Sequence, residues 1–196
     1  RELGKPGALY VFVNGGPVSH YNMPDDPAAQ GASVFINELI PHIDKTYRTI
    51  ASREHRGIEG FSQGGRGTMR LSLRHADLFL SSAPGGGGYE TERKISESGG
   101  YESEKLKFAR GDNVYDLARD YAQRRKQASV PAIKLQLHVG TKGFNYENNL
   151  AYMEYLDSLA IPYAKVIVPE APHSASKIYH EAARQLVDFH LTNFGQ

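Results

Sequence analysis

The stretch Gly60-Phe61-Ser62-Gln63-Gly64 decides the fold of this chain. A short strand-like run, Gly57-Ile58-Glu59, precedes it, and a helix-like run over 68–73 follows it. A serine on so tight a strand-to-helix turn is exposed, and glycines two residues to either side remove the Cβ atoms that would collide in the bend. Ser62 is therefore predicted to be a nucleophile at a helix N-terminus, where free N–H groups favour developing negative charge. The alternative is that Ser62 only caps a glycine-rich helix.

The composition is that of one globular domain. The chain has 196 residues, of which 40% are apolar and 23% are charged, and this is enough to bury a substantial core. A net charge of +1 gives no electrostatic reason to expect nucleic acid or a membrane as partner. The absence of cysteine excludes disulfides, thiolate metal sites and a cysteine nucleophile. The chain begins at Arg1 and not at methionine, so we expect further residues upstream in the native protein.

Strand-like and helix-like segments alternate along the chain. Helices are predicted over about 34–40, where Pro41 bends or ends the helix, and over about 68–75, 114–125, 146–159 and 176–191. Strands are predicted over 8–13, 57–59, 78–83, 133–139 and 163–168. This order predicts an α/β fold with a mostly parallel sheet flanked by helices. We expect a single domain over 1–196, with a polar excursion at about 85–130 that is either a solvated crossover or a lid over the substrate.

A serine nucleophile needs a base within hydrogen-bonding reach, and eight histidines are available. His173 follows the last predicted strand, at the edge where parallel sheets place catalytic side chains, and it lies in the last loop before the terminal helix. It is predicted to be the base. His138 lies within a strand and is predicted to be structural. No spacing typical of metal ligands occurs, so neither a metal nor another cofactor is expected.

Several blocks of sequence carry a resemblance to a known family. They are Glu38-Leu39-Ile40-Pro41-His42-Ile43-Asp44, Tyr47-Arg48-Thr49, Gly60-Phe61-Ser62-Gln63-Gly64-Gly65 and Asp77-Leu78-Phe79. These blocks resemble the esterase D, feruloyl esterase and antigen 85 mycolyltransferase group of α/β-hydrolases. The resemblance implies an α/β-hydrolase acting on carboxylic esters, with Ser62 as nucleophile and His173 as base. It also favours a secreted or periplasmic protein.

The chain departs from the family pattern at the acid of the triad. Such esterases read Gly-x-x-Asp from the position of Gly140, and the aspartate orients the histidine; here that position is Gly143. The acid fixes the tautomer of the histidine and stabilises the imidazolium, and its loss costs on the order of 10⁴ in turnover. Glu147 is the nearest carboxylate downstream and is the candidate replacement. It is alternatively a first-turn residue that complements the helix dipole. Glu170 and Asp112 are weaker candidates.

The second departure concerns the oxyanion hole. One N–H of this hole belongs to the residue after the nucleophile, Gln63. The other comes, in the family, from the glycine-rich loop of an earlier strand. The segment 8–16 resembles the family's next strand more than this one, which predicts that the chain lacks N-terminal strands of the sheet. Alternatively, Asn14-Gly15-Gly16 is itself the oxyanion loop and Gly16 gives the N–H. Loss of one donor costs about 10²- to 10³-fold in rate.

These observations predict a serine esterase that works through an acyl-enzyme, with weak activity if the acid is lost. The expected substrate is an acyl or feruloyl ester of a sugar, or another small ester. The alternative is a non-catalytic α/β-hydrolase-like binding or scaffold domain that has lost its triad acid. A small-molecule or carbohydrate ester is the expected partner, with no nucleic acid and no membrane. A homo-oligomer that completes its sheet with a partner's strand is a third reading.

Overall fold

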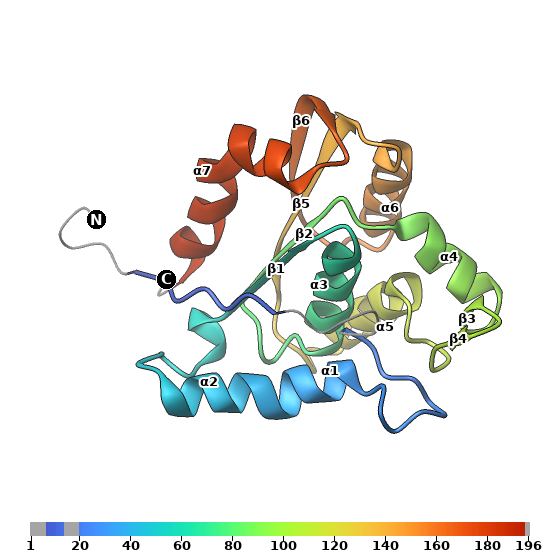
Figure 1. The fold of residues 1–196 in the computed structure, drawn as a ribbon, viewed down its shortest axis with the longest axis horizontal. Coiled ribbons are helices and arrows are strands. Elements are labelled where there is room, and N and C mark those ends of the chain that lie inside the picture. Colours follow the sequence, from blue (N-terminus) through green and yellow to red (C-terminus); the bar gives the residue numbers. More distant parts are fainter. Residues whose placement is uncertain (1–6, 14–19, 195–196) are drawn as a thin grey trace.

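Four parallel strands form the central sheet of the protein (Figure 1). A computed structural model describes residues 7–13 and 20–194. The strands lie in the order β1-β2-β5-β6, and every neighbouring pair is parallel. Their bounds are β1 Gly57–Phe61, β2 Ser81–Gly85, β5 Lys134–Lys142 and β6 Ala164–Pro172. The α/β fold predicted from the alternation of segments is confirmed.

Helices cover both faces of this sheet. Figure 1 shows α7 on one side and α3, α5 and α6 on the other. The two faces follow from the alternation of side chains along a strand: Val166 and Val168 of β6 pack with α7, whereas Ile167 between them packs on the opposite cluster. No helix in the described ranges combines the length and apolar character needed to cross a membrane. The helices span Gln63–Arg74 (α3), Val114–Lys126 (α5), Tyr146–Ser158 (α6) and Ala175–Asn193 (α7).

The helix predicted around Pro41 continues through the proline. Pro41 lies in the first turn of the α-helical segment 40–46, where a missing N–H is tolerated. The five residues before this segment form a π-helical turn, in which the hydrogen-bonding pattern of the helix changes. Phe35, Ile36 and Ile40 pack against a cluster that contains Ile58 of β1. The helix thus runs through α1 Gly31–Val34, η2 Phe35–Leu39 and α2 Ile40–Thr46, and a 3-10 turn, η3 Arg53–His55, leads to β1.

Buried ion pairs fix the polar excursion to the helix that follows Ser62. Glu92 is fully buried and accepts hydrogen bonds from Arg66 (2.7 Å) and Arg70 (2.9 Å) of α3. Arg66 also donates two hydrogen bonds to Glu102. Two positive and two negative side chains therefore neutralise one another, and all of them except Glu102 are buried. The excursion contains α4 Tyr89–Glu97, the short hairpin β3 Tyr101–Ser103 and β4 Leu106–Lys107, and α5.

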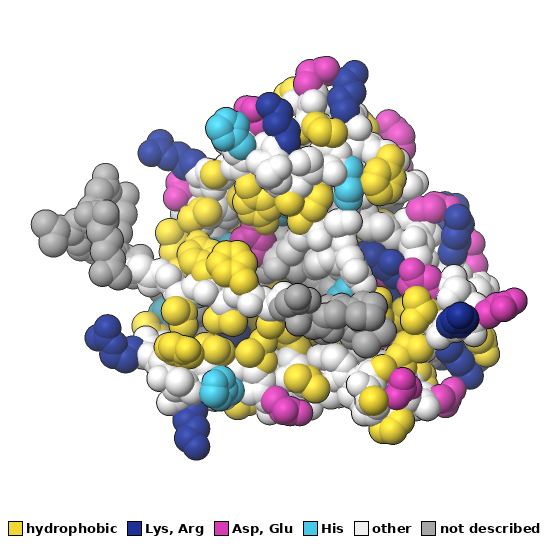
Figure 2. Space-filling model, in the orientation of Figure 1, with side chains coloured by type: hydrophobic (Ala, Val, Ile, Leu, Met, Phe, Trp, Pro, Cys, Tyr) yellow, Lys and Arg dark blue, Asp and Glu magenta, His cyan; other side chains and the backbone are white. Residues whose placement is uncertain are grey.

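Two strand predictions need correction. The predicted strand 8–13 is wrong, because residues 7–13 form no strand in the structure, and their large apolar side chains are exposed, between α7 and α2 in the view of Figure 2. A strand forms only where a neighbouring strand satisfies its backbone groups. Among the described residues, no ladder that includes this segment is formed. The strand predicted over 78–83 begins later, at Ser81, and continues through Pro84 to Gly85, two residues beyond its predicted end.

Gly65 allows α3 to approach the sheet closely. A Cβ atom built on Gly65 would lie 2.3 Å from the carbonyl oxygen of Gly85, whereas one on Gly64 would meet nothing within 4 Å. Gly65→Ala is therefore expected to lower the free energy of unfolding by about 1–3 kcal/mol through overpacking. Gly64→Ala is the matched control and is expected to raise it by up to about 1 kcal/mol, through helix propensity. Urea denaturation of both variants measures the difference; equal stabilities would contradict the close approach.

Candidate active site

Ser62 occupies a strained turn between β1 and α3. Its backbone has φ 58° and ψ −114°, a region that L-residues avoid at a cost of about 1–3 kcal/mol. The Ser62 N–H donates to the carbonyl of Gly85 at the end of β2, and this bond holds the turn in place. A Cβ on Gly60 would lie 2.5 Å from the backbone oxygen of Gly64, so only glycine fits there. The predicted elbow geometry is therefore present, with Gly60 and Gly65, rather than Gly64, as the glycines that it needs.

The structure brings Ser62 and His173 together. The Nε2 atom of His173 lies 2.8 Å from the Oγ atom of Ser62, although 111 residues separate the two in sequence. His173 directly follows β6, whose C-terminal end lies at the same edge of the parallel sheet as that of β1. Burial lowers the pKa of His173 below its ordinary value of 6.5. A neutral imidazole at this distance can accept the proton of the Ser62 hydroxyl.

Asn145 faces Nδ1 of the histidine, where the sequence analysis predicted a carboxylate. Its Oδ1 atom lies 3.2 Å from Nδ1 of His173, and its Nδ2 atom donates to the carbonyls of Gly86 (2.6 Å) and Gly87 (3.1 Å). These two carbonyls require the amide nitrogen on their side, which leaves Oδ1 to face the ring. Nδ1 therefore carries the hydrogen, and Nε2 presents its lone pair to Ser62.

Asn145 has a structural peculiarity, and its place in the sequence also made it a candidate. The residue stands at the N-cap of α6, a position where asparagine normally bonds the helix, yet its side chain makes no cap hydrogen bond. It is buried, with 2% of its surface exposed, and Asn149 one turn later donates to its carbonyl oxygen (2.8 Å). In the sequence, Asn145 comes shortly after a predicted strand, whose end lies at the catalytic edge of the sheet. This position could have identified it as the partner of His173, but we considered only carboxylates, because the family uses an aspartate.

The three carboxylates considered from the sequence are not brought to the histidine. Glu147 is exposed on the first turn of α6, because helical geometry turns it away from the buried positions Asn145 and Asn149. Glu170 is paired with Lys142 (3.6 Å). Asp112 is paired with Arg74 (2.6 Å), at the far end of α3. The replacement of the triad acid by Glu147 is therefore not supported by the geometry.

Of the two N–H groups proposed for the oxyanion hole, the structure describes the one of Gln63. Gln63 is the first residue of α3, so its N–H belongs to the unpaired first turn of the helix, where partial positive charge accumulates. Its side chain donates to the hydroxyl of Tyr21 (3.2 Å). The second candidate donor, Gly16, lies outside the described residues.

Two aromatic rings flank His173. The ring centroids of Phe61 and Phe144 lie 4.8 Å and 4.5 Å from that of His173. Phe61 is partly buried and packs with the α7 side of the sheet, whereas 83% of Phe144 is exposed. Phe144 therefore presents an apolar surface to solvent directly beside the Ser62–His173 pair.

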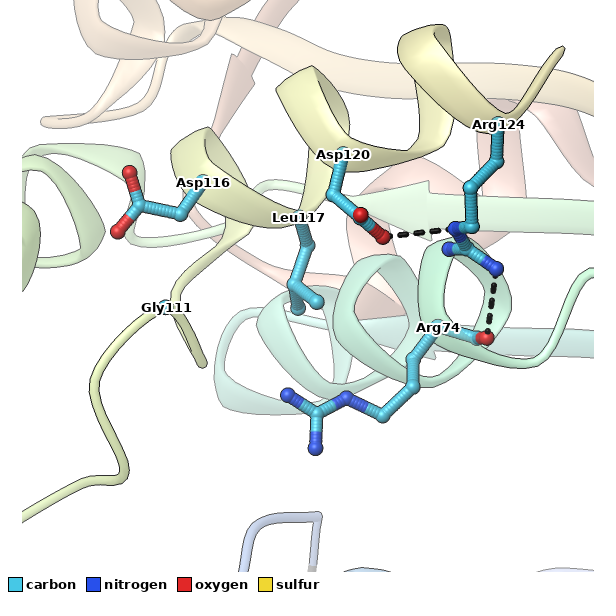
Figure 3. A pocket seen from close by; sticks show the side chains of 6 residues that line it. All are labelled: Arg74, Gly111, Asp116, Leu117, Asp120 and Arg124. Carbon is cyan, nitrogen blue, oxygen red and sulfur yellow. Dashed lines mark hydrogen bonds and ion pairs between the residues drawn. The ribbon is translucent and has the colours of Figure 1, made fainter. Parts of the chain in front are cut away.

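A surface depression lies away from this site. Its volume is about 490 Å³, and it is lined by residues of α3, α5 and the loop before α5. Figure 3 shows six of its lining residues, among them Arg124, which bonds Asp120 (2.7 Å) and the backbone oxygen of Arg74. Arg74 ends α3 while Ser62 precedes its first residue, a separation of about 18 Å along a helix of this length. Each charged side chain that lines the depression has an ion-pair partner: Asp120 pairs with Arg124, Arg74 with Asp112 and Asp116 with Arg119. None of the lining residues belongs to the serine site. Within the described residues, no three histidine or carboxylate side chains group as a metal site.

The lowered pKa of His173 predicts the pH dependence of any activity. The base must be neutral, so kcat/KM should rise with pH through the pKa of His173 and level off above it. Burial favours the neutral form and Asn145 adds no negative charge, so the midpoint is expected below 6.5. Initial rates of p-nitrophenyl acetate hydrolysis, with product read at one fixed alkaline pH, measure this midpoint. A midpoint at or above 6.5 would indicate that a carboxylate reaches the histidine.

Comparison by sequence gives one short match. No protein-family model matches the chain. A stretch of 52 residues, 26% of the chain, is 40% identical to an endo-1,4-beta-xylanase/feruloyl esterase of Xylanibacter ruminicola, of which it covers 7%.

Comparison by structure covers most of the chain. A ferulic acid esterase superposes with a TM-score of 0.70 at 21% identity, over 90% of this chain and 65% of the other. An S-formylglutathione hydrolase of Staphylococcus aureus superposes with a TM-score of 0.64 at 21% identity, over 82% of this chain and 61% of the other. MPT51 of Mycobacterium tuberculosis superposes with a TM-score of 0.69 at 15% identity, over 92% of this chain and 74% of the other. The chain thus spans less than two thirds of the length of the first two proteins.

These matches agree with the local geometry. The parallel sheet, the strained serine between a strand and a helix, and the histidine after the last strand all occur in the order expected from the resemblance. The chain has the α/β-hydrolase fold, and the predicted resemblance to the esterase D, feruloyl esterase and antigen 85 mycolyltransferase group is confirmed.

Proposed function

We propose that this protein hydrolyses carboxylic esters through a covalent acyl-enzyme on Ser62. The observation that carries the proposal is the 2.8 Å contact between Ser62 Oγ and His173 Nε2, made by a serine held on a strained turn. Strain of this kind persists only where the surrounding structure enforces it, and it is concentrated at functional sites. Two of the similar proteins are named as feruloyl or ferulic acid esterases, and this supports the hydrolysis of esters.

The chemical steps follow from the positions of the two side chains. As Ser62 Oγ bonds to the ester carbonyl carbon, its proton passes to His173 Nε2 and the carbonyl electron pair moves onto oxygen. The Gln63 N–H stabilises this oxyanion. Collapse expels the alcohol, which takes the proton from His173 and leaves the acyl group on Ser62. Water then gives a proton to His173 and attacks the acyl carbon, and the acid departs as Ser62 recovers its proton.

The substrate is proposed to be an acyl or feruloyl ester of a sugar, or another small ester. The exposed ring of Phe144 beside His173 supports a substrate with an aromatic or apolar group next to the scissile bond. An aromatic group of the substrate stacked on Phe144 would remove apolar surface of both rings from water, which favours binding. The name of the ferulic acid esterase, which shares the fold, points to the same kind of acyl group.

A binding or scaffold domain is the second candidate, and one observation favours it. The group that faces Nδ1 of His173 is the neutral amide of Asn145 and not a carboxylate. An amide can hold the tautomer, but it stabilises the imidazolium less than a carboxylate would. A domain that binds esters without turning them over would tolerate this exchange.

A covalent probe separates the two candidates. A fluorophosphonate reacts with a serine that a neighbouring base activates, so labelling of the 196-residue chain at Ser62, together with hydrolysis of p-nitrophenyl acetate, is expected. Labelling should fall strongly in His173→Ala. If the folded protein takes up no probe and releases no nitrophenol, the esterase proposal fails and the binding role remains.

A further inference from the structure

The side chain of Asn149, one helical turn after Asn145 in α6, holds two backbone carbonyls at once. Its Nδ2 atom donates to the carbonyl of Gly87 (3.0 Å) and to that of Asn145 (2.8 Å). Carbonyl oxygens only accept, so both contacts need the amide N–H₂ group, which has two hydrogens to give. The side chain is buried, so little water competes for these bonds. Asn149 therefore ties the start of α6 to the turn that follows β2.

The turn that this side chain holds, between β2 and α4, lies against His173. A Cβ atom built on Gly86 would be 3.3 Å from Cε1 of the histidine ring. Residues 85–88 are all glycine, so the turn has no side chains with which to pack and depends on hydrogen bonds to stay in place. The carbonyls of Gly86 and Gly87 also hold the amide of Asn145, whose Oδ1 atom faces the ring. A shift of the turn would therefore pass to Asn145 and to the histidine.

We infer that Asn149 is a positioning residue, which fixes the tautomer of His173 by holding Asn145. Its consequence for catalysis rests on the proposed ester hydrolysis. A carboxylate would attract the imidazolium by its charge, but the neutral amide acts only through a hydrogen bond, whose strength depends steeply on geometry. The amide therefore has to be held in place. Asn149 bonds the backbone oxygen of Asn145 and shares the carbonyl of Gly87 with the Asn145 side chain, so it acts on both ends of that residue.

Asn149→Leu tests this role, because leucine is of similar size, favours helices and donates no hydrogen bond. Each carbonyl keeps one donor: that of Gly87 keeps the Asn145 amide (3.1 Å), and that of Asn145 keeps the backbone N–H of residue 149 (3.0 Å). The fold should therefore survive, which urea denaturation checks. The value of kcat/KM for p-nitrophenyl acetate is expected to fall by about 10- to 100-fold. Asn148→Leu, at a half-buried position of the same helix, is the matched control and should leave it unchanged.

A double-mutant cycle separates action through Asn145 from a general loosening of α6. In the Asn145→Ala background, Asn149→Leu should lower kcat/KM by less than about threefold, because the side chain that it positions is already gone. An equal loss in both backgrounds would contradict the inference, and so would an unchanged kcat/KM in Asn149→Leu alone.

The ring nitrogens of His173 give a readout that does not depend on turnover. Nitrogen NMR of isotopically labelled protein distinguishes a ring nitrogen that carries hydrogen from one with a free lone pair. One tautomer, with the hydrogen on Nδ1, is expected in the unaltered chain and in Asn148→Leu, and a mixture in Asn149→Leu. An unaltered chain that neither hydrolyses esters nor takes up the fluorophosphonate would overturn the proposed function and leave this measurement valid. A single tautomer in Asn149→Leu would overturn the inference.

Discussion

Ser62→Ala is expected to reduce ester hydrolysis by on the order of 10⁴- to 10⁶-fold and to abolish fluorophosphonate labelling. The hydroxyl is the group that bonds to the carbonyl carbon, and residual catalysis can come only from the oxyanion donor and from binding. The fold should survive, because alanine keeps the Cβ that this backbone already accommodates at φ 58°. Burst kinetics with p-nitrophenyl acetate and intact mass after labelling measure the effect.

The matched control is Ser158→Ala, which removes an exposed serine hydroxyl at the end of α6 and should leave turnover and labelling unchanged. Urea denaturation of both variants excludes unfolding as the cause of any loss. Labelling that persists in Ser62→Ala would show that another residue reacts with the probe, and the proposed nucleophile would be wrong.

Asn145→Ala has the second largest expected effect, a loss of kcat on the order of 10² to 10⁴. Without the amide, nothing on the Nδ1 side holds the hydrogen there, and the imidazole can present an N–H instead of a lone pair to Ser62. The bonds to the carbonyls of Gly86 and Gly87 are lost as well, so a lower free energy of unfolding is expected beside the kinetic effect. Steady-state kinetics and urea denaturation separate the two.

A rescue experiment distinguishes orientation of the histidine from stability of the loop. A Cβ on Gly143 would lie 3.2 Å from Oδ1 of Asn145 and 3.6 Å from the backbone nitrogen of His173, so an aspartate side chain there starts beside the histidine. In the Asn145→Ala background, Gly143→Asp is expected to recover turnover and to raise the midpoint of the pH profile, because a carboxylate favours the charged imidazolium. Recovery of stability without recovery of turnover would show that Asn145 acts only on the loop.

Much of the fold was predictable because it depends on neighbours in sequence. The helices that begin at Val114 and Tyr146 and the C-terminal helix were predicted to within two residues, since hydrophobic periodicity is a local property. The helix after Ser62 begins at Gln63, earlier than predicted. The strand 8–13 was wrong for the opposite reason. Its residues have the composition of a strand, but a strand also needs a partner with unpaired backbone groups, and none in the described chain bonds to it.

The site divides in the same way. Ser62 and His173 were predicted as a pair from their places relative to the strands, and they lie within hydrogen-bonding distance. Glu147 was preferred on charge, yet helical geometry points it outward, and Asn145, two residues earlier, faces the ring. That choice depends on carbonyls nearly 60 residues away in sequence.

The sequence by itself determined the elbow around Ser62. Steric limits on a backbone at φ 58°, and the close approach of the Gly64 oxygen to Gly60, act within the turn that joins β1 to α3. Only the tertiary structure decided which group faces the histidine and which segment stays outside the sheet. Both depend on where distant backbone groups end up, and short-range residue patterns do not record that. The nucleophile is therefore specified by its neighbours in sequence, and its assistance by neighbours in space.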